Sequence, residues 1–239
     1  MKTRQKKTWS EQMDLYQIAI DGPAASGKST VAKLAAKRLG AFYVNTGEMY
    51  RTIALACIKG GINAEDEVAV AEALTKWTMD FRDSGTGEID IIFNGAPVVK
   101  SELRLPEVAM ASSQVAKVPA VREWMRQKQR DCRKLGTIIM EGRDICTVIL
   151  PDATAKFFIT ATPEERARRR LAQSGEVSDG ATLKSVAAEI AARDLQDSTR
   201  KIAPLKPAED ALQIVTDGMS AEEVADLVIK TFKEKANLK

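Results

Sequence analysis

An eight-residue glycine-rich segment near the N-terminus constrains this chain more than any other feature. Residues 22–29 read Gly-Pro-Ala-Ala-Ser-Gly-Lys-Ser, which fits the pattern G-x-x-x-x-G-K-S in full. The apolar run 17–21 precedes the segment, and apolar residues at helical spacing follow it up to Gly40, so it joins a predicted strand to a predicted helix. Glycines in that setting let backbone N–H groups wrap a phosphate, and the start of the helix adds positive potential. The segment therefore predicts a loop that binds the phosphates of a nucleoside triphosphate.

The polar side chains of this loop have distinct expected roles. Lys28 is expected to reach the β- and γ-phosphates, and the Ser29 hydroxyl to contact Mg²⁺. An ordinary glycine turn before a helix is the alternative, and it is disfavoured because every fixed position of the pattern matches. The predicted nucleotide-binding residues are Gly22, Pro23, Ala24, Ala25, Ser26, Gly27, Lys28, Ser29 and Thr30.

Short apolar runs alternate with helical patterns along most of the chain. The runs that read as buried strands are 17–21, 42–44, 137–140, 156–160 and 212–216. Capping residues mark the starts of several helices between them, among them Thr46, Thr162 and Ser220. Buried strands separated by helices predict an α/β fold, with a mainly parallel sheet covered by helices on both faces.

A stretch in the middle of the chain has a different character. Asn63 is expected to cap a helix, and beyond that helix the apolar residues alternate with polar ones. Residues 88–93 and 96–99 flank Asn94-Gly95, which is a strong signal for a β-hairpin. A hairpin among alternating strands and helices indicates an insertion.

These changes of pattern predict a single domain with two additions. Small polar residues after an arginine cluster suit a flexible lid. The expected organisation is a polar extension over 1–16, a single domain over 17–239 with its core in 17–62 and 118–239, an insertion over about 63–117, and a lid over about 166–182.

The absence of histidine removes whole classes of chemistry. Among the 239 residues there is no imidazole for a Ser-His-Asp or Cys-His mechanism or for a histidine zinc site. The three cysteines form no C-x-x-C pair, which fits a reducing compartment. No run approaches the ~18 apolar residues of a membrane span, and a net charge of +3 gives no general reason to expect nucleic acid as a partner. The expectation is a soluble cytoplasmic protein without membrane or nucleic-acid partners.

Arginines are frequent in the second half of the chain, and phosphoryl transfer is the reaction that would use them. That reaction needs in-line positioning and positive charge around the transferring group, which guanidinium groups supply. The cluster 166–170 directly precedes a small polar segment, so a lid hinged there could bring arginines onto the phosphates. The guanine-recognition pattern N-K-x-D is absent, which weakens the hypothesis that the chain is a GTPase.

Several longer motifs run in order from residue 18 towards the C-terminus. They read IAIDGPAASGKSTVAK, NTGEMYR, SSQVAKVPAVR, EGRDICTVILPDA, FFITATPEERARRR and RDLQDSTRKIAPLKPAEDA. Together they resemble the motifs of the bacterial cytidylate kinases, which phosphorylate CMP and dCMP. The resemblance implies a P-loop kinase core with a five-stranded parallel sheet, a monophosphate-binding insertion that contains the hairpin, and a short lid. It also implies ATP as the phosphate donor, Mg²⁺, and a monomer.

The resemblance further implies a role for each matching residue. Residues implied to bind ATP besides the loop are Arg166 and Arg169. Residues implied to bind the monophosphate acceptor are Thr46, Tyr50, Arg51, Ser113, Arg122, Arg143, Asp144, Arg193, Asp197 and Arg200. Residues implied to take part in catalysis are Lys28, Arg143, Arg193 and Arg200.

The implied base-reading set consists of Ser113, Arg122 and Asp144, and its chemistry suits cytosine. A carboxylate can accept from the cytosine amino group, and a guanidinium can donate to the ring acceptors. Uracil reverses that donor–acceptor pattern and would leave buried groups unpaired, at about 1–3 kcal/mol each. Arg51 would grip the CMP phosphate, Asp197 the sugar hydroxyl.

Three positions depart from the pattern of the family. Ala25 stands where glycine is frequent, Glu48 replaces a small residue in NTGEMYR, and Cys146 follows GRDI where glycine is usual. If the position of Cys146 requires a positive φ, its side chain would store strain.

Two alternative functions remain beside that of a cytidylate kinase. The first is a P-loop kinase for another nucleoside monophosphate such as UMP, which the base-reading set disfavours. The second is a nucleotide-dependent regulator that binds nucleic acid through the arginine cluster, and it predicts salt-sensitive binding to oligonucleotides.

Overall fold

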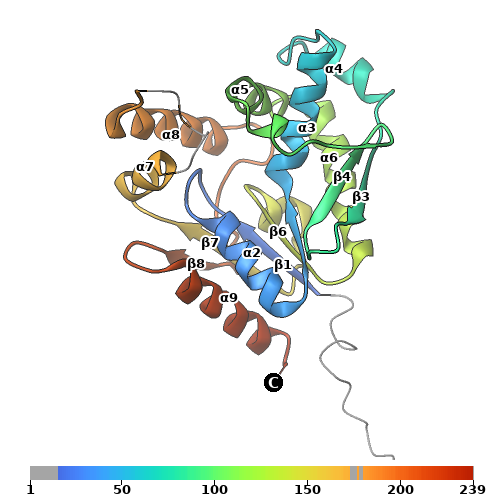
Figure 1. The fold of residues 1–239 in the computed structure, drawn as a ribbon. Coiled ribbons are helices and arrows are strands. Elements are labelled where there is room, and N and C mark those ends of the chain that lie inside the picture. The colour runs from blue at the N-terminus through green and yellow to red at the C-terminus, as the bar shows by residue number, and fades with distance from the viewer. Residues whose placement is uncertain (1–15, 173–176, 178–179, 239) are drawn as a thin grey trace, which may run out of the picture.

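The computed structural model describes residues 16–172, 177 and 180–238 (Figure 1). Apart from Tyr16, the predicted extension over 1–16 lies outside the described residues, and so does part of the predicted lid. Within the described ranges, no helix combines the length and the apolar character needed to cross a membrane.

A five-stranded sheet forms the centre of the molecule, in the order β2-β6-β1-β7-β8. Its strands are β1 (Gln17–Asp21), β2 (Phe42–Asn45), β6 (Ile138–Gly142), β7 (Ala155–Thr160) and β8 (Leu212–Val215). All neighbouring strands are parallel, so their carboxyl ends meet at one edge of the sheet. The predicted α/β fold with a five-stranded parallel sheet is confirmed.

Helices cover both faces of this sheet (Figure 1). Along β1, Ile18 and Ile20 lie in one buried cluster with side chains of α2 (Lys28–Leu39) and α9 (Ala221–Lys235). Ala19 lies in another cluster, on the opposite face, as the two-residue period of a strand requires. The helices that share this second cluster include α3 (Thr46–Lys59), α5 (Pro106–Val115) and α6 (Pro119–Asp131).

The middle stretch forms a second, antiparallel sheet in the order β3-β4-β5. Its elements are α4 (Glu67–Leu74), β3 (Met79–Asp83), β4 (Ile89–Phe93) and β5 (Ala96–Pro97), followed by the short helix η1 (Glu102–Arg104). The predicted hairpin is confirmed: Asn94 and Gly95 have φ of 49° and 81°, the positive values that a two-residue turn needs. The strand β3, which pairs with β4, was not predicted.

Helix starts show where two capping predictions are wrong. The cap of α3 is Asn45, whose side chain accepts from the Glu48 N–H, and Thr46 is the first helical residue. The cap of α4 is Asp66 rather than Asn63. Near both helix starts the sequence offers more than one residue that can act as an N-cap. The tertiary structure therefore determines which of them caps the helix.

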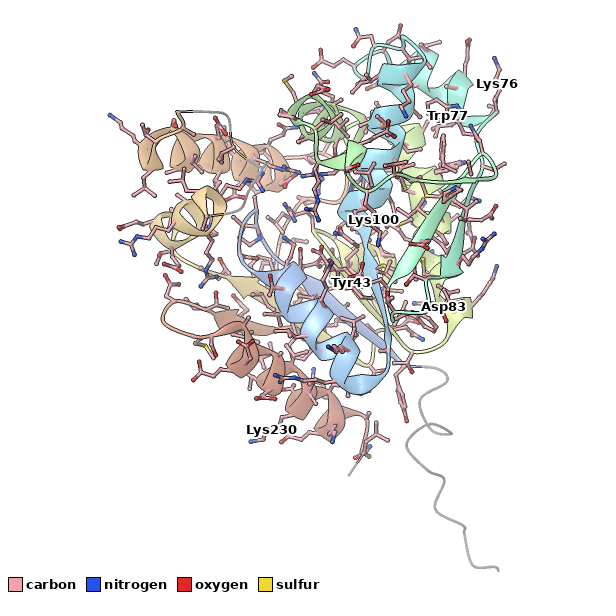
Figure 2. The ribbon with its side chains drawn as sticks, in the orientation of Figure 1. Tyr43, Lys76, Trp77, Asp83, Lys100 and Lys230 are labelled. Atoms are coloured by element: carbon pink, nitrogen blue, oxygen red, sulfur yellow. The ribbon has the colours of Figure 1, made fainter. Side chains whose placement is uncertain are left out.

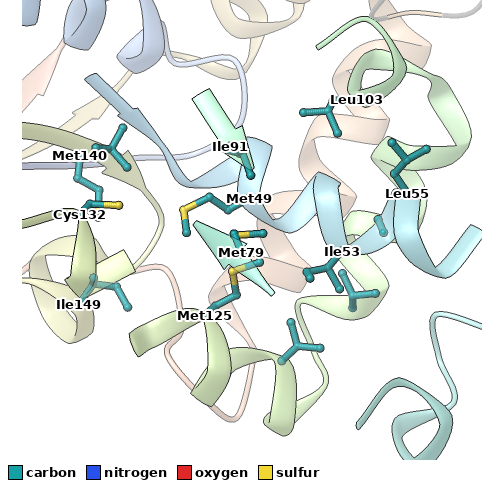
Figure 3. Close-up of a cluster of buried hydrophobic side chains, with 14 of the residues drawn as sticks. Met49, Ile53, Leu55, Met79, Ile91, Leu103, Met125, Cys132, Met140 and Ile149 are labelled. Atoms are coloured by element: carbon teal, nitrogen blue, oxygen red, sulfur yellow. The ribbon is translucent and has the colours of Figure 1, made fainter. Parts of the chain in front are cut away.

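Four methionines join the insertion to the main core (Figure 3). Met79 of β3 lies in the same buried cluster as Met49 of α3, Met125 of α6 and Met140 of β6. Each of the four is at most 1% exposed. Unbranched methionine side chains fill irregular gaps, and here they make one continuous apolar core beneath the insertion and the sheet.

The remaining elements border the strand ends. They are η2 (Cys132–Leu135), the π-helical turn η3 (Ile145–Ile149), α7 (Pro163–Leu171) and α8 (Leu183–Ser198). A small cluster of Ala167, Val186 and Ile190 joins α7 to α8, and Ala25 of the glycine-rich loop packs against it.

Candidate active site

The glycine-rich loop runs from the end of β1 into the first turn of α2. Gly27, at the N-cap of α2, has a left-handed φ of 86°. At Gly22 the backbone approaches β7 so closely that a Cβ would lie 2.0 Å from the carbonyl oxygen of Ile159. Only glycine satisfies both geometries without strain. The first N–H groups of α2 lack partners within the helix, so this end of it favours an anion.

Lys28 is buried at the base of the loop. Its ammonium group donates to the carbonyl oxygen of Pro23 at 3.0 Å and lies 3.9 Å from a carboxylate oxygen of Glu141. Burial lowers the pKa of Lys28 to about 7, and the positive charges of Arg143 and Arg193 add to that effect. Glu141 opposes it. Burial therefore disfavours the charged form of this lysine, and an anion beside it would favour that form.

Glu141 is the main residue that the sequence analysis left without a role. It is the penultimate residue of β6, beside the loop, and one of its carboxylate oxygens accepts from the Ser29 hydroxyl at 2.8 Å and from the Tyr43 hydroxyl at 3.2 Å (Figure 2 shows Tyr43). Its carbonyl oxygen accepts from the Thr46 hydroxyl at 2.8 Å. Burial, together with the charge of Glu141, raises the pKa of Tyr43. An acidic residue directly after the predicted strand 137–140 is the signal that could have identified it.

The insertion reaches the rim of this site through a pair of lysines. Lys33 of α2 and Lys100 of the insertion donate to the two carboxylate oxygens of Glu88, at 2.9 and 3.0 Å (Figure 2 shows Lys100). A backbone hydrogen bond from Tyr43 to Gly87 lies beside them. These contacts tie the hairpin to the helix that follows the loop.

On the other side of the site, Arg122 and Asp144 form a buried ion pair at 2.9 Å. Arg122 also donates to the Tyr50 hydroxyl at 3.1 Å and lies over its ring, 5.7 Å from the centroid. Burial raises the pKa of Tyr50 to about 12, so the phenol stays neutral. The residues come from α6, from the segment after β6, and from α3, and together they place a donor beside an acceptor.

Between these two sides lies a group of arginines around Asp197. Arg143 donates to Asp197 at 2.9 Å, and Arg200 lies 3.4 Å from it. Burial lowers the pKa of Arg193 to about 10, and the nearby charge of Arg143 lowers it further. Within the described ranges, the buried Nε atoms of Arg193 and Arg200 have no hydrogen-bond partner. Crowded cations with unused donors fit a polyanionic ligand.

One cavity of about 760 Å³ connects all three groups. The predicted site residues that line it are Ala24, Ala25, Ser26, Gly27, Lys28, Ser29, Thr30, Thr46, Tyr50, Arg51, Ser113, Arg122, Arg143, Asp144, Arg193, Asp197 and Arg200. Those that do not line it are Gly22, Pro23, Arg166 and Arg169. Lining residues that the sequence analysis missed include Lys33, Lys100, Ser112 and Glu141, whereas Arg170, which also lines the cavity, belongs to the predicted arginine cluster 166–170.

The family model for cytidylate kinase matches residues 18–234. The chain belongs to the cytidylate kinase family. It is therefore an enzyme, and the kinase reaction of this family uses a nucleotide phosphate donor. The motif resemblance found in the sequence is confirmed.

Two curated relatives share this family name. The cytidylate kinase of Geobacillus sp. strain WCH70 is 45% identical over 222 residues, which are 92% of this chain and 97% of that protein. The cytidylate kinase of Limosilactobacillus reuteri strain DSM 20016 is 44% identical over 220 residues, 91% of this chain and 95% of that protein. A solved structure of an uncharacterized protein from Eubacterium ventriosum ATCC 27560 has a TM-score of 0.50 at 12% identity and covers 91% of this chain and 98% of that one. That likeness concerns the fold alone.

In this cytidylate kinase fold, Arg166 and Arg169 lie behind the glycine-rich loop instead of lining the cavity. Arg166 donates to the carbonyl oxygen of Ala24 at 3.2 Å and forms an ion pair with Asp194. Arg169 donates to the carbonyl oxygen of Ser26 at 3.1 Å. Each arginine thus holds a carbonyl group of the loop. The lid predicted from this cluster extends over positions that lie outside the described residues.

The three departures from the family pattern have different structural meanings. Ala25 adopts a left-handed φ of 56°, the conformation in which glycine is favoured. Glu48 accepts from the Asn45 side-chain amide at 3.3 Å, and burial raises its pKa. Cys146 is not among the described residues with positive φ, so the strain suggested for it is absent. Its thiol lies 3.5 Å from the carbonyl oxygens of Ala19 and Phe157.

Proposed function

We propose that this enzyme transfers the γ-phosphoryl group of ATP, with Mg²⁺, to the phosphate of CMP or dCMP by direct in-line displacement. Phosphorylation of CMP and dCMP is the reaction of the family to which the chain belongs. The observation that supports the proposal most is the single cavity of about 760 Å³. It has a triphosphate-binding loop at one end and a buried donor–acceptor pair at the other.

The donor end suits ATP and a divalent cation. Backbone N–H groups of the loop and the ammonium of Lys28 would hold the phosphates. The Ser29 hydroxyl and the Glu141 carboxylate lie 2.8 Å apart, and oxygen donors of this kind fit Mg²⁺. When bound there, the cation would neutralise charge on the β- and γ-phosphates. Arg166 and Arg169 contribute from behind, by holding the carbonyl groups of the loop in place.

The acceptor end suits a cytosine nucleotide. Asp144 would accept from the cytosine amino group and Arg122 would donate to the ring acceptors, with Ser113 beside them in the cavity wall. Their mutual ion pair holds both groups in orientation before the base arrives. Arg51, with Thr46 and Tyr50, would bind the acceptor phosphate.

The transfer itself needs only positioning and charge in this proposal. Lys28, Arg143, Arg193 and Arg200 would surround the transferring phosphoryl group and stabilise the charge on its oxygens. Asp197, which two of these arginines contact, would hold the sugar hydroxyl of the acceptor. The acceptor phosphate attacks directly, so the reaction uses no protein nucleophile and forms no phosphoenzyme.

We further propose that the protein works as a monomer in the cytoplasm, without membrane or nucleic-acid partners. The near balance of 36 Lys+Arg against 33 Asp+Glu supports the last of these points, because nucleic-acid binders usually carry a strong basic excess.

A coupled ADP-release assay tests the proposal. The assay combines ATP and Mg²⁺ with each of CMP, dCMP, UMP, AMP and GMP. We expect fast turnover with CMP and dCMP alone, and its loss when a chelator removes the cation. Equal turnover with UMP would contradict the base-reading role of Asp144 and Arg122, and silence with every acceptor would contradict the proposed reaction.

A further inference from the structure

Asp21 is a buried carboxylate at the end of β1, directly before the glycine-rich loop. It is 0% exposed. One of its oxygens accepts from the backbone N–H of Ile145 and the other from that of Cys146, each at 2.8 Å. These N–H groups begin η3, where a helix leaves its donors unsatisfied. Asp21 lies in β1, a separate element of the fold, and its carboxylate satisfies both of these donors.

The two hydrogen bonds hold one end of a very short segment whose other end is also fixed to Asp21. In the parallel pairing of β1 with β6, Asp21 is in register with Gly142. The residues between these attachment points are Arg143 and Asp144. The backbone of Asp21 therefore holds the start of this segment and its side chain holds the end.

The two backbone donors beside Asp21 explain why a carboxylate occupies this fully buried position. Burial raises the pKa of Asp21 to about 6, and the two backbone hydrogen bonds counteract part of that rise. The group is thus ionised at neutral pH and both oxygens act as acceptors. An amide of the same shape offers only one acceptor oxygen and would turn an N–H donor towards another donor.

We propose that Asp21 is a positioning residue for the acceptor nucleotide, which acts by fixing the orientation of Arg143 and Asp144. The inference rests on the proposed roles of those two residues in phosphate binding and base reading. Because Asp21 directly precedes Gly22, it also places the base-reading segment in a fixed relation to the loop that holds the phosphate donor.

The decisive comparison is between Asp21→Asn and Cys146→Ala. Asp21→Asn keeps the volume and removes one acceptor. Cys146→Ala removes the thiol contacts with Ala19 and Phe157 and a thiol interaction with the Asp21 side chain at the same buried spot, but leaves both backbone N–H groups and both Asp21 oxygens in place. A loss of stability alone would affect the two variants alike.

We expect Asp21→Asn to raise KM for CMP about tenfold or more, the effect of losing a charge-assisted hydrogen bond. The ratio of kcat/KM for CMP to that for UMP falls with it, while the Kd for ATP measured without an acceptor stays within about twofold of wild type. Cys146→Ala keeps KM, the CMP-to-UMP ratio and the ATP Kd near wild type. An unchanged KM and ratio in folded Asp21→Asn, or the same losses in Cys146→Ala, would overturn the proposal.

A measurement on the wild-type protein covers the case in which Asp21→Asn does not fold. Coupling between two sites is reciprocal, so CMP must strengthen the bonds that position its own binding residues. We expect saturating CMP to slow hydrogen exchange at the amides of Ile145 and Cys146, and unchanged exchange there would overturn the proposal. Turnover of CMP by the same preparation tests the proposed function separately.

Discussion

The two ends of the cavity are built in different ways. At the donor end, one continuous segment supplies nearly everything: residues 22–30 form the loop and the helix start, and neighbouring groups contact its carbonyl oxygens. At the acceptor end, side chains from separate elements meet: Tyr50 from α3, Arg122 from α6 and Asp144 from the segment after β6.

The difference determines how each end can fail. A binding site made of backbone groups tolerates changes in most of its side chains, since the N–H groups remain. A site made of paired buried charges depends on each partner, because removing one leaves the other uncompensated. The acceptor end should therefore be more sensitive in stability, and the donor end should be sensitive at only a few positions.

The largest effect is expected from breaking the buried pair of the acceptor end. Arg122→Met leaves the Asp144 carboxylate without its cation, so we expect a loss of about 3–5 kcal/mol in the free energy of unfolding. The double variant Arg122→Met, Asp144→Leu removes both charges and should recover most of that loss, while CMP turnover stays lost in both variants. Urea unfolding and the ADP-release assay measure the two quantities. A double variant as unstable as the single one would argue against the pair as the source of the effect.

At the donor end, the corresponding change is Lys28→Met. Its charge serves the transferring phosphates rather than the fold, so we expect kcat to fall by about 10²–10³-fold, as for removal of one electrostatic group from a transition state. The fold should survive, since burial makes the charged form of this lysine costly. Steady-state kinetics with CMP checks this, and Lys37→Met, an exposed lysine of the same helix, is the control. Near-normal kcat in Lys28→Met would remove Lys28 from the catalytic set.

The contrast between the two ends also explains what could be predicted from the sequence. The strands of the central sheet are short, mostly apolar runs, and the loop is a contiguous pattern, so both are local signals. The strand β3 gave no such signal, because Met79 is its only buried residue and its pairing with β4 is what makes it a strand.

Tertiary proximity accounts for the remaining misses. Glu141 stands 112 residues from Ser29 in the chain, and only the parallel pairing of the sheet brings them together. Arg166 and Arg169 were expected on the nucleotide side, but the face of α7 that carries them packs behind the loop. Sequence patterns identify which residues carry charge, whereas the side of the loop they occupy depends on how the helix is docked.

A smaller effect at the donor end is a change in protonation. The pKa of Lys28 is about 7 because of burial and the neighbouring arginines, so most of the amine is neutral at pH 8. Anionic phosphates favour the charged form and raise that pKa, so ATP binding at pH 8 should take up as much as one proton, and ATP affinity should fall as the pH rises above about 7. Calorimetry in buffers of different ionisation enthalpy measures the uptake. Uptake that persists in Lys28→Met would assign the proton to another group.

The smallest effect is expected within the loop itself, at Ala25. Its left-handed φ of 56° disfavours any residue with a Cβ, while its methyl group packs against the cluster of Ala167, Val186 and Ile190. Ala25→Gly relieves the backbone strain, but it loses the methyl contact and raises the conformational entropy of the unfolded chain, so we expect stability to change by less than about 1 kcal/mol. Ala25→Val keeps a side chain but is β-branched, and at this φ it should cost about 1–3 kcal/mol. Thermal unfolding of the two variants measures the balance. A glycine variant that is the less stable of the two would show that the methyl contact, rather than the backbone, sets the shape of the loop, and the donor end would then depend on its side chains as the acceptor end does.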